Sequence, residues 1–146
     1  AAPAEGGRPM VLGGVHIECP VGPVAHSDGD AIMHAVADAL LAATHQPDLG
    51  TLFPNSTTEH EGRDSAEFLA EAMKRLSEEG WSIGNIDITV LCDEPNISHH
   101  KEQICQSLHE HTGAPVNIKG KTFEGTNRVG AIEVHVVTLV QRGTSA

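Results

Sequence analysis

Aromatic side chains are scarce in this sequence: 3% of its 146 residues are aromatic, with one Trp and no Tyr. Aliphatic residues must therefore supply most of any hydrophobic core. The three cysteines, Cys19, Cys92 and Cys105, lie far apart and form no C-x-x-C pair. They suggest neither a disulfide framework nor a cysteine zinc site, and a reducing compartment fits best. No apolar run approaches the roughly 18 to 20 residues of a membrane span, so we expect a soluble protein.

Basic residues are also few. The sequence has nine Lys and Arg against twenty Asp and Glu, which gives a net charge of −11 with His neutral. The basic residues are scattered rather than gathered into a stripe, so we do not expect a nucleic-acid partner. An anionic ligand would need local compensation by metal ions, helix N-termini and a few basic side chains.

The residue patterns predict one mixed α/β domain over residues 1–146. Gly13-Gly14 predicts a hairpin turn between two short strands, and residues 45–62 read as a long functional loop. The expected strands are Met10–Leu12, Val15–Ile17, Ile86–Val90, Val116–Lys121 and Ala131–Arg142, and the expected helices are Ala31–Thr44, Asp64 or Ser65 to Glu79, and Ser98–Thr112. Ser98 is the expected cap of the third helix. This order favours a mixed sheet with helices packed on one face.

The densest group of ionisable residues is His26-Ser27-Asp28-Gly29-Asp30, followed by His34. On its own this group allows two interpretations. The polar residues could cap a helix while His34 packs against the core, or His34 could supply a metal ligand while amides at the helix start meet a phosphate. A calcium loop is excluded, because the Asp spacing and distal Glu of an EF-hand are absent.

Further segments follow this group in a fixed order along almost the whole chain. The set comprises Gly7–Gly14, His26–Asp30, Asp38–Leu41, Asp48–Pro54, Asp64-Ser65, Gly84–Thr89, Pro95 and Asn117–Glu124. Together these segments closely resemble the 2-C-methyl-D-erythritol 2,4-cyclodiphosphate synthase family. The resemblance implies a homotrimer whose sheets face the threefold axis and whose active sites lie between subunits.

The activity that the resemblance implies is a metal-dependent phosphorus-oxygen lyase of non-mevalonate isoprenoid synthesis. The substrate, 4-diphosphocytidyl-2-C-methyl-D-erythritol 2-phosphate, would form the cyclic diphosphate with release of CMP. Zn²⁺ and Mg²⁺ (or Mn²⁺) would neutralise and orient the phosphates. The implied location is the bacterial cytoplasm or a plastid.

Residue by residue, the resemblance implies ligands for metals and phosphates. His34 matches the zinc ligand and Glu124 the carboxylate that holds the second metal. The residues expected at the reacting phosphates are His26, Ser27, Thr122 and Lys121, with Arg128 in place of an arginine near the central cavity. Family members also carry an Asp-x-His before the segment matched by Gly7; since Ala1–Gly6 contain neither residue, we expect it upstream of Ala1.

The remaining matches concern the nucleoside and the erythritol. Asp48 and Gly50 fall at ribose-contacting positions. Phe53–Thr57 matches a loop over the erythritol, with Asn55 in place of the more usual Asp. Cys92–Ser98 matches the cytosine pocket, and its expected contacts are Cys92, Pro95, Asn96 and Ile97. Asn96 replaces a frequent Lys, and the Gly125–Gly130 segment is shorter than in the family.

Several of these positions also allow a purely structural interpretation. Lys121 and Thr122 could be outward strand residues, and Asp48 could be the acid of an Asx turn. Six other histidines match no family ligand and are expected at the surface: His45, His60, His99, His100, His109 and His111. Two other functions remain open, namely a non-catalytic trimer that binds a cytidine nucleotide or isoprenoid phosphate, and a scaffold without a small-molecule ligand.

Overall fold

The computed structural model describes residues 10–18, 30–53, 65–93, 96–122 and 132–142. The strands are β1 (Met10–Leu12), β2 (Val15–Ile17), β3 (Trp81–Cys92), β4 (Val116–Lys121) and β5 (Ile132–Arg142). The helices are α2 (Ala31–Ala43), α3 (Leu49–Leu52), α4 (Ser65–Glu78), the 3-10 turn η1 (Ile97–His100) and α5 (Lys101–Thr112). No helix in this part of the chain is long and apolar enough to cross a membrane.

The main sheet is mixed, as expected, with β3 in the middle. β4 pairs with β3 in parallel, and β5 pairs with its other edge in antiparallel. β1 and β2 form a separate antiparallel hairpin. Gly13 and Gly14 turn this hairpin with φ angles of 62° and 84°, positive values that glycine adopts without steric cost.

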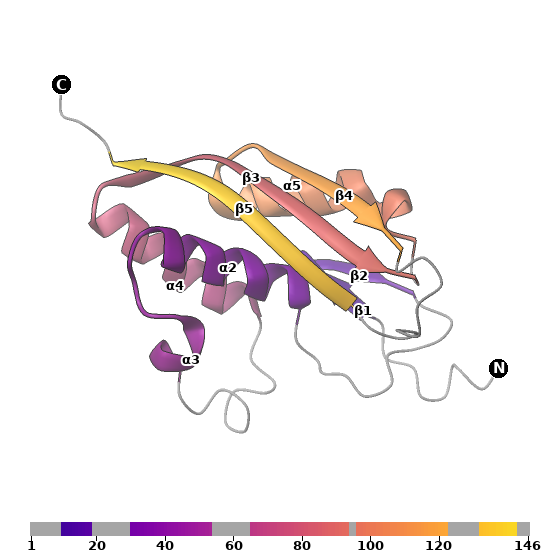
Figure 1. The fold of residues 1–146 in the computed structure, drawn as a ribbon, viewed down its shortest axis with the longest axis horizontal. Helices are drawn as coiled ribbons and strands as arrows, with labels where there is room; N and C mark the ends of the chain where they lie inside the picture. The colour runs from indigo at the N-terminus through magenta and orange to yellow at the C-terminus, as the bar shows by residue number, and fades with distance from the viewer. Residues whose placement is uncertain (1–9, 19–29, 54–64, 94–95, 123–131, 143–146) are drawn as a thin grey trace.

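The hydrophobic core lies between the main sheet and the helices. Ile86, Ile88 and Val90 alternate along β3 and are fully buried on the helix side of the sheet. α2 meets them with a stripe at helical spacing that includes Val36 and Leu40. Figure 1 shows α2, α4 and α5 on the same side of the sheet, so the predicted packing of helices on one face is confirmed.

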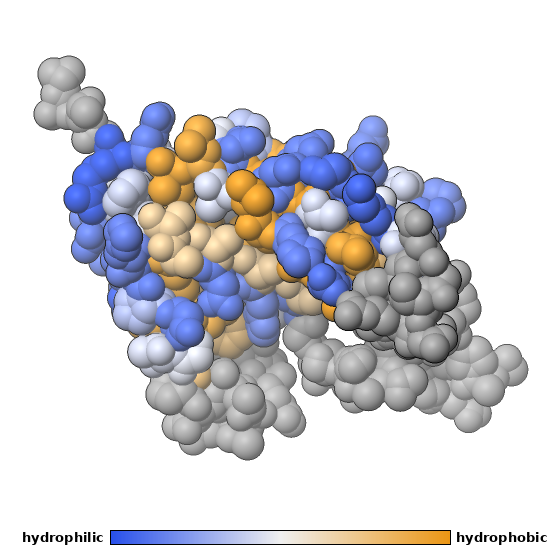
Figure 2. Space-filling model, viewed as in Figure 1, coloured by the Kyte–Doolittle hydropathy of each residue, from blue (hydrophilic) through white to orange (hydrophobic). Residues whose placement is uncertain are grey.

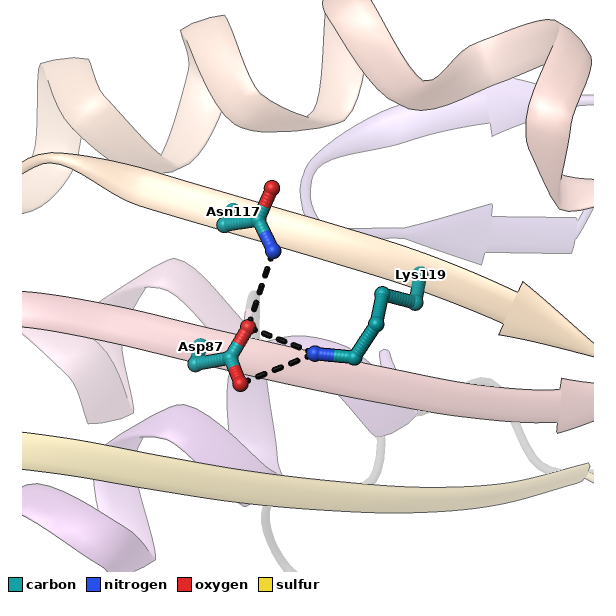
Figure 3. Close-up of polar contacts among 3 residues, drawn as sticks. All are labelled: Asp87, Asn117 and Lys119. Atoms are coloured by element: carbon teal, nitrogen blue, oxygen red, sulfur yellow. Dashed lines mark hydrogen bonds and ion pairs between the residues drawn. The ribbon is translucent and has the colours of Figure 1, made fainter.

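The other face of the main sheet carries no helix among the described residues. Asp87 on β3 accepts hydrogen bonds from Lys119 Nζ at 2.8 Å and from Asn117 Nδ2 at 2.9 Å, both on β4 (Figure 3). On β5 of the same face, Val137 is 70% exposed and Leu139 62% exposed. Figure 2 shows hydrophobic residues among hydrophilic ones along the path of β5.

The structure differs from the sequence-based expectation in three places. β3 begins at Trp81 rather than Ile86, and a register shift between Ile83 and Asn85 interrupts the alternation that would have revealed its first residues. The expected loop after residue 45 contains the helical turn α3. The cap of the third helical segment is Asn96, whose side chain accepts the Ser98 N–H; Ser98 itself lies within η1.

Candidate functional site

One buried carboxylate, that of Asp30, joins the β1-β2 hairpin to the start of α2. Its Oδ1 accepts the N–H of Gly13 at 2.7 Å and of Met33 at 2.9 Å, and its Oδ2 accepts the N–H of Gly14 at 2.7 Å. Burial raises the pKa of this carboxyl, while the hydrogen bonds and the neighbouring His34 act in the opposite direction. Asp30 therefore caps α2 and fixes the hairpin against it.

His34, the predicted zinc ligand, lies in the first turn of α2 and faces the start of α4. Its Nε2 lies 3.2 Å from the hydroxyl of Ser65. The Phe68 ring, one turn further along α4, meets the imidazole edge to face with centroids 5.2 Å apart. Phe53 packs against the same Phe68 ring at 4.8 Å. α4 thus holds the imidazole by one polar and one aromatic contact.

The predicted ribose contacts lie on the short helix α3. The Asp48 carboxylate caps this helix by accepting the Thr51 N–H at 2.9 Å, and its hydrogen bonds with Thr51 lower its pKa. Asp48 and Gly50 are both exposed. Asp48 therefore caps α3, as the structural interpretation of this residue expected, and its exposure leaves the side chain accessible to a ligand.

A second set of predicted residues gathers at the carboxyl ends of the parallel strands β3 and β4. Cys92 ends β3, and Lys121, at the end of β4, pairs in register with the residue before it. Thr122 follows directly, and both Lys121 and Thr122 are exposed. Ile97 of η1 lies so close to β4 that a Cβ added at Gly120 would come within 2.9 Å of it. Asn96 precedes η1, so these residues share one corner of the fold.

The described site residues thus form two groups. The first group is His34 with Phe53, Asp48 and Gly50, on α2, α3 and the segment that follows α3. The second group is Cys92, Asn96, Ile97, Lys121 and Thr122, at the ends of β3 and β4. Figure 1 shows α3 and the carboxyl ends of β3 and β4 on different sides of the molecule. Six predicted residues lie outside the described residues: His26, Ser27, Asn55, Pro95, Glu124 and Arg128.

Among the described residues, these groups coincide neither with a complete metal site nor with the hollow at the far end of α4. Within the described ranges, no three His, Cys, Asp or Glu side chains are gathered as a metal site would require. His34 is one suitable ligand, because no hydrogen bond joins its Nδ1 to another described residue. A hollow of about 480 Å³ lies at the far end of α4, beside Met73, Trp81 and Thr112. None of the predicted site residues that the structure describes lines it.

Comparison with known proteins decides the family. A model of the YgbB family matches residues 2–141. A 2-C-methyl-D-erythritol 2,4-cyclodiphosphate synthase of Hydrogenobaculum is 38% identical over 94% of this chain and 90% of that protein. This chain belongs to the 2-C-methyl-D-erythritol 2,4-cyclodiphosphate synthase family. The family predicted from the sequence is therefore confirmed.

Other members extend this result to plants and to solved structures. The chloroplastic synthase of Catharanthus roseus is 40% identical over 94% of this chain, which spans 61% of that protein. A solved synthase in a CDP-bound form has a TM-score of 0.83 at 36% identity, covering 92% of this chain and 91% of that one. A CDP complex from Plasmodium falciparum has a TM-score of 0.77 at 33% identity, and the match covers 90% of this chain and 82% of that one.

Sequence reasoning gave no site role to Ser65 or Phe68. The pair Asp64-Ser65 contributed to the family resemblance, and Phe68 falls within the helix expected from Asp64 or Ser65 to Glu79. Both contact His34, because α4 approaches α2 at this residue. This approach is a tertiary contact between segments about thirty residues apart, which no local pattern encodes.

Proposed function

We propose that this chain converts 4-diphosphocytidyl-2-C-methyl-D-erythritol 2-phosphate to 2-C-methyl-D-erythritol 2,4-cyclodiphosphate. In this reaction the 2-phosphate oxygen attacks the β-phosphorus of the diphosphate, and the bond from that phosphorus to CMP breaks. The observation that carries the proposal is the match in sequence and fold to a CDP-bound synthase over nine-tenths of both chains. Because bonds exchange at phosphorus without a redox step, catalysis requires mainly positioning and charge neutralisation.

The second group of site residues suits the nucleotide end of this substrate. The Lys121 ammonium and the Thr122 hydroxyl are both exposed at the end of β4, where they can donate hydrogen bonds to phosphate oxygens. Cys92, Asn96 and Ile97 would border the cytosine, with backbone groups reading its edge. Asp48 and Gly50 would contact the ribose from α3.

We further propose that the enzyme uses Zn²⁺ together with Mg²⁺ or Mn²⁺. The Nδ1 atom of His34 is free among the described residues to bind zinc, and Glu124 would hold the second metal. When bound, such ions withdraw charge from phosphoryl oxygens. The residues of the chain would place the phosphates, exclude water and orient the attacking oxygen.

A homotrimer explains why the described site residues fall into two separate groups. We propose that copies of this chain meet through the helix-free face of the main sheet, where Val137 and Leu139 are 70% and 62% exposed. The Asp87 and Lys119 charges on this face are already paired with each other, which lowers the cost of covering them. Each active site would then combine the first group of one subunit with the second group of its neighbour.

The assembly can be tested by placing charge on this face. Val137→Asp combined with Leu139→Asp should shift the mass measured by sedimentation from that of a trimer to that of a monomer. Ala70→Asp, at an exposed position on α4, is the matched control and should leave the trimer intact. A wild-type chain that sediments as a monomer would contradict this part of the proposal.

The reaction is tested by incubating the protein with its substrate, Zn²⁺ and Mg²⁺ and following CMP release and the cyclic diphosphate by ³¹P NMR. His34→Gln should lower the rate by orders of magnitude, whereas His111→Gln, at an exposed position of α5, should not. Binding of CMP without turnover by the wild type would instead identify a non-catalytic nucleotide-binding relative.

The bacterial and chloroplastic relatives support a location in a bacterial cytoplasm or a plastid.

A further inference from the structure

Among the described residues, the first turn of α4 holds the imidazole of His34. Ser65 is 7% exposed, and its hydroxyl oxygen lies 3.2 Å from Nε2 of His34. Phe68 contacts the same ring at 5.2 Å between centroids. The two residues are three positions apart and therefore share a face of α4. Rotation of the ring would break both contacts together.

The Ser65 hydroxyl has a second partner, which fixes its own position. Its oxygen accepts the backbone N–H of Asp30 at 3.2 Å, in the residue that caps α2. A serine oxygen can accept two hydrogen bonds and donate one. It can therefore also accept a hydrogen bond from Nε2–H of His34, and the Asp30 N–H, at the start of the helix that carries His34, holds it in place.

The close approach of Ser65 decides which ring nitrogen remains available to a ligand. A zinc ion lies about 2.0 to 2.1 Å from a histidine nitrogen, along the axis of its lone pair. The Ser65 oxygen already occupies this direction at Nε2. A metal must then bind Nδ1, and the neutral ring that binds it carries its proton on Nε2.

We propose that Ser65 is a positioning residue that accepts the Nε2–H of His34 and thereby keeps the Nδ1 lone pair directed at the ligand. Phe68 holds the plane of the ring in the same orientation. The metal as the ligand of Nδ1 rests on the proposed function, whereas the contact between Nε2 of His34 and the Ser65 oxygen is present without it. The inference can therefore be tested without metal.

The first test is the tautomer of His34 in the metal-free protein at mildly alkaline pH. Long-range ¹H–¹⁵N correlation spectra distinguish a proton on Nε2 from one on Nδ1, and the His34 signals are assigned by their loss in His34→Gln. We expect the Nε2–H form alone in the wild type, a mixture in Ser65→Ala and the wild-type pattern in Ser65→Thr. Ser77→Ala, in the exposed last turn of α4, is the matched control. A proton on Nδ1 in the wild type, or an unchanged spectrum in Ser65→Ala, overturns the proposal.

The second test is zinc affinity, measured by competition with a chromophoric chelator. Removal of a group that orients a metal ligand typically weakens binding by about 10- to 100-fold, and we expect this loss in Ser65→Ala and recovery in Ser65→Thr. Ser65→Cys keeps the size of the side chain but offers a weaker acceptor, so it should fall between them. It also serves if the alanine variant does not fold.

The two tests separate failure of this inference from failure of the proposed function. Equal zinc affinity in the wild type and Ser65→Ala would overturn the role of Ser65 in metal binding. A wild type that binds no zinc and releases no CMP would instead overturn the proposed function. In that case the tautomer comparison still decides whether Ser65 orients His34.

Discussion

Replacing Asp30 by alanine should be among the most destabilising single changes in the described part of this protein. Its carboxylate accepts three backbone hydrogen bonds, from Gly13, Gly14 and Met33, at 2.7 to 2.9 Å. The N–H groups of Gly13 and Met33 are buried, and each costs about 1 to 3 kcal/mol when left without a partner, whereas Gly14 is exposed and its N–H can bind water. Part of this cost is offset, because the variant no longer buries a charge. The expected net loss is about 2 to 4 kcal/mol, a large part of the stability of an ordinary domain, which is about 5 to 15 kcal/mol.

Urea unfolding followed by circular dichroism, at one subunit concentration, measures this loss. With a slope of about 1 to 3 kcal/mol per molar urea, the midpoint should fall by roughly 1 to 4 M. Asp38→Ala is the matched control on the same helix, because its carboxylate accepts one exposed hydrogen bond, from the Leu49 N–H at 3.0 Å. The control should lose only about 0.5 to 1 kcal/mol. If Asp30→Ala is no less stable than Asp38→Ala, the carboxylate does not join the hairpin to α2 as argued.

Two further predictions concern the charge pair on the sheet and the hairpin turn. Lys119 and Asn117 lower the pKa of Asp87 below 3.8, so the stability it contributes is present above the unfolded-state pKa and is lost as pH falls through the lower folded-state value. A ¹³C carboxyl titration should show this midpoint rising in Lys119→Met, and an unchanged midpoint would refute the pairing. Gly13→Ala should cost more than the roughly 1 to 2 kcal/mol of a left-handed backbone, because its Cβ would lie 2.6 Å from an Ile104 methyl group. Gly80→Ala, at φ +78° in open space, should cost only the backbone part in the same urea assay.

The parts of the fold that the sequence predicted well are those whose residues carry local signals. Gly13-Gly14 requires a turn, so the hairpin strands were predicted at their observed bounds. The first residues of β3 were missed, because the register shift between Ile83 and Asn85 breaks the period of two. Asn96 was missed as a cap because Ser98, a residue equally suited to capping, follows it two positions later.

The candidate site was predictable only as a set of residue types. Family resemblance drew attention to His34, Phe53 and Thr122, but no sequence pattern could place Phe53 and His34 against the same Phe68 ring. That arrangement depends on the packing of α2 against α4, which follows from their buried apolar faces rather than from polar residues. For the same reason Ser65 was taken as a helix boundary rather than as the partner of His34.

Stability and site geometry depend on a shared set of contacts in this protein. Asp30 caps the helix that carries His34, and its backbone N–H binds the Ser65 oxygen that in turn meets the His34 ring. A change at Asp30 should therefore disturb the fold and the imidazole together. A change at Ser65 removes the contact to the ring but leaves all three hydrogen bonds of the Asp30 carboxylate in place. Comparing unfolding and zinc affinity across both positions thus separates loss of folded protein from loss of ring orientation.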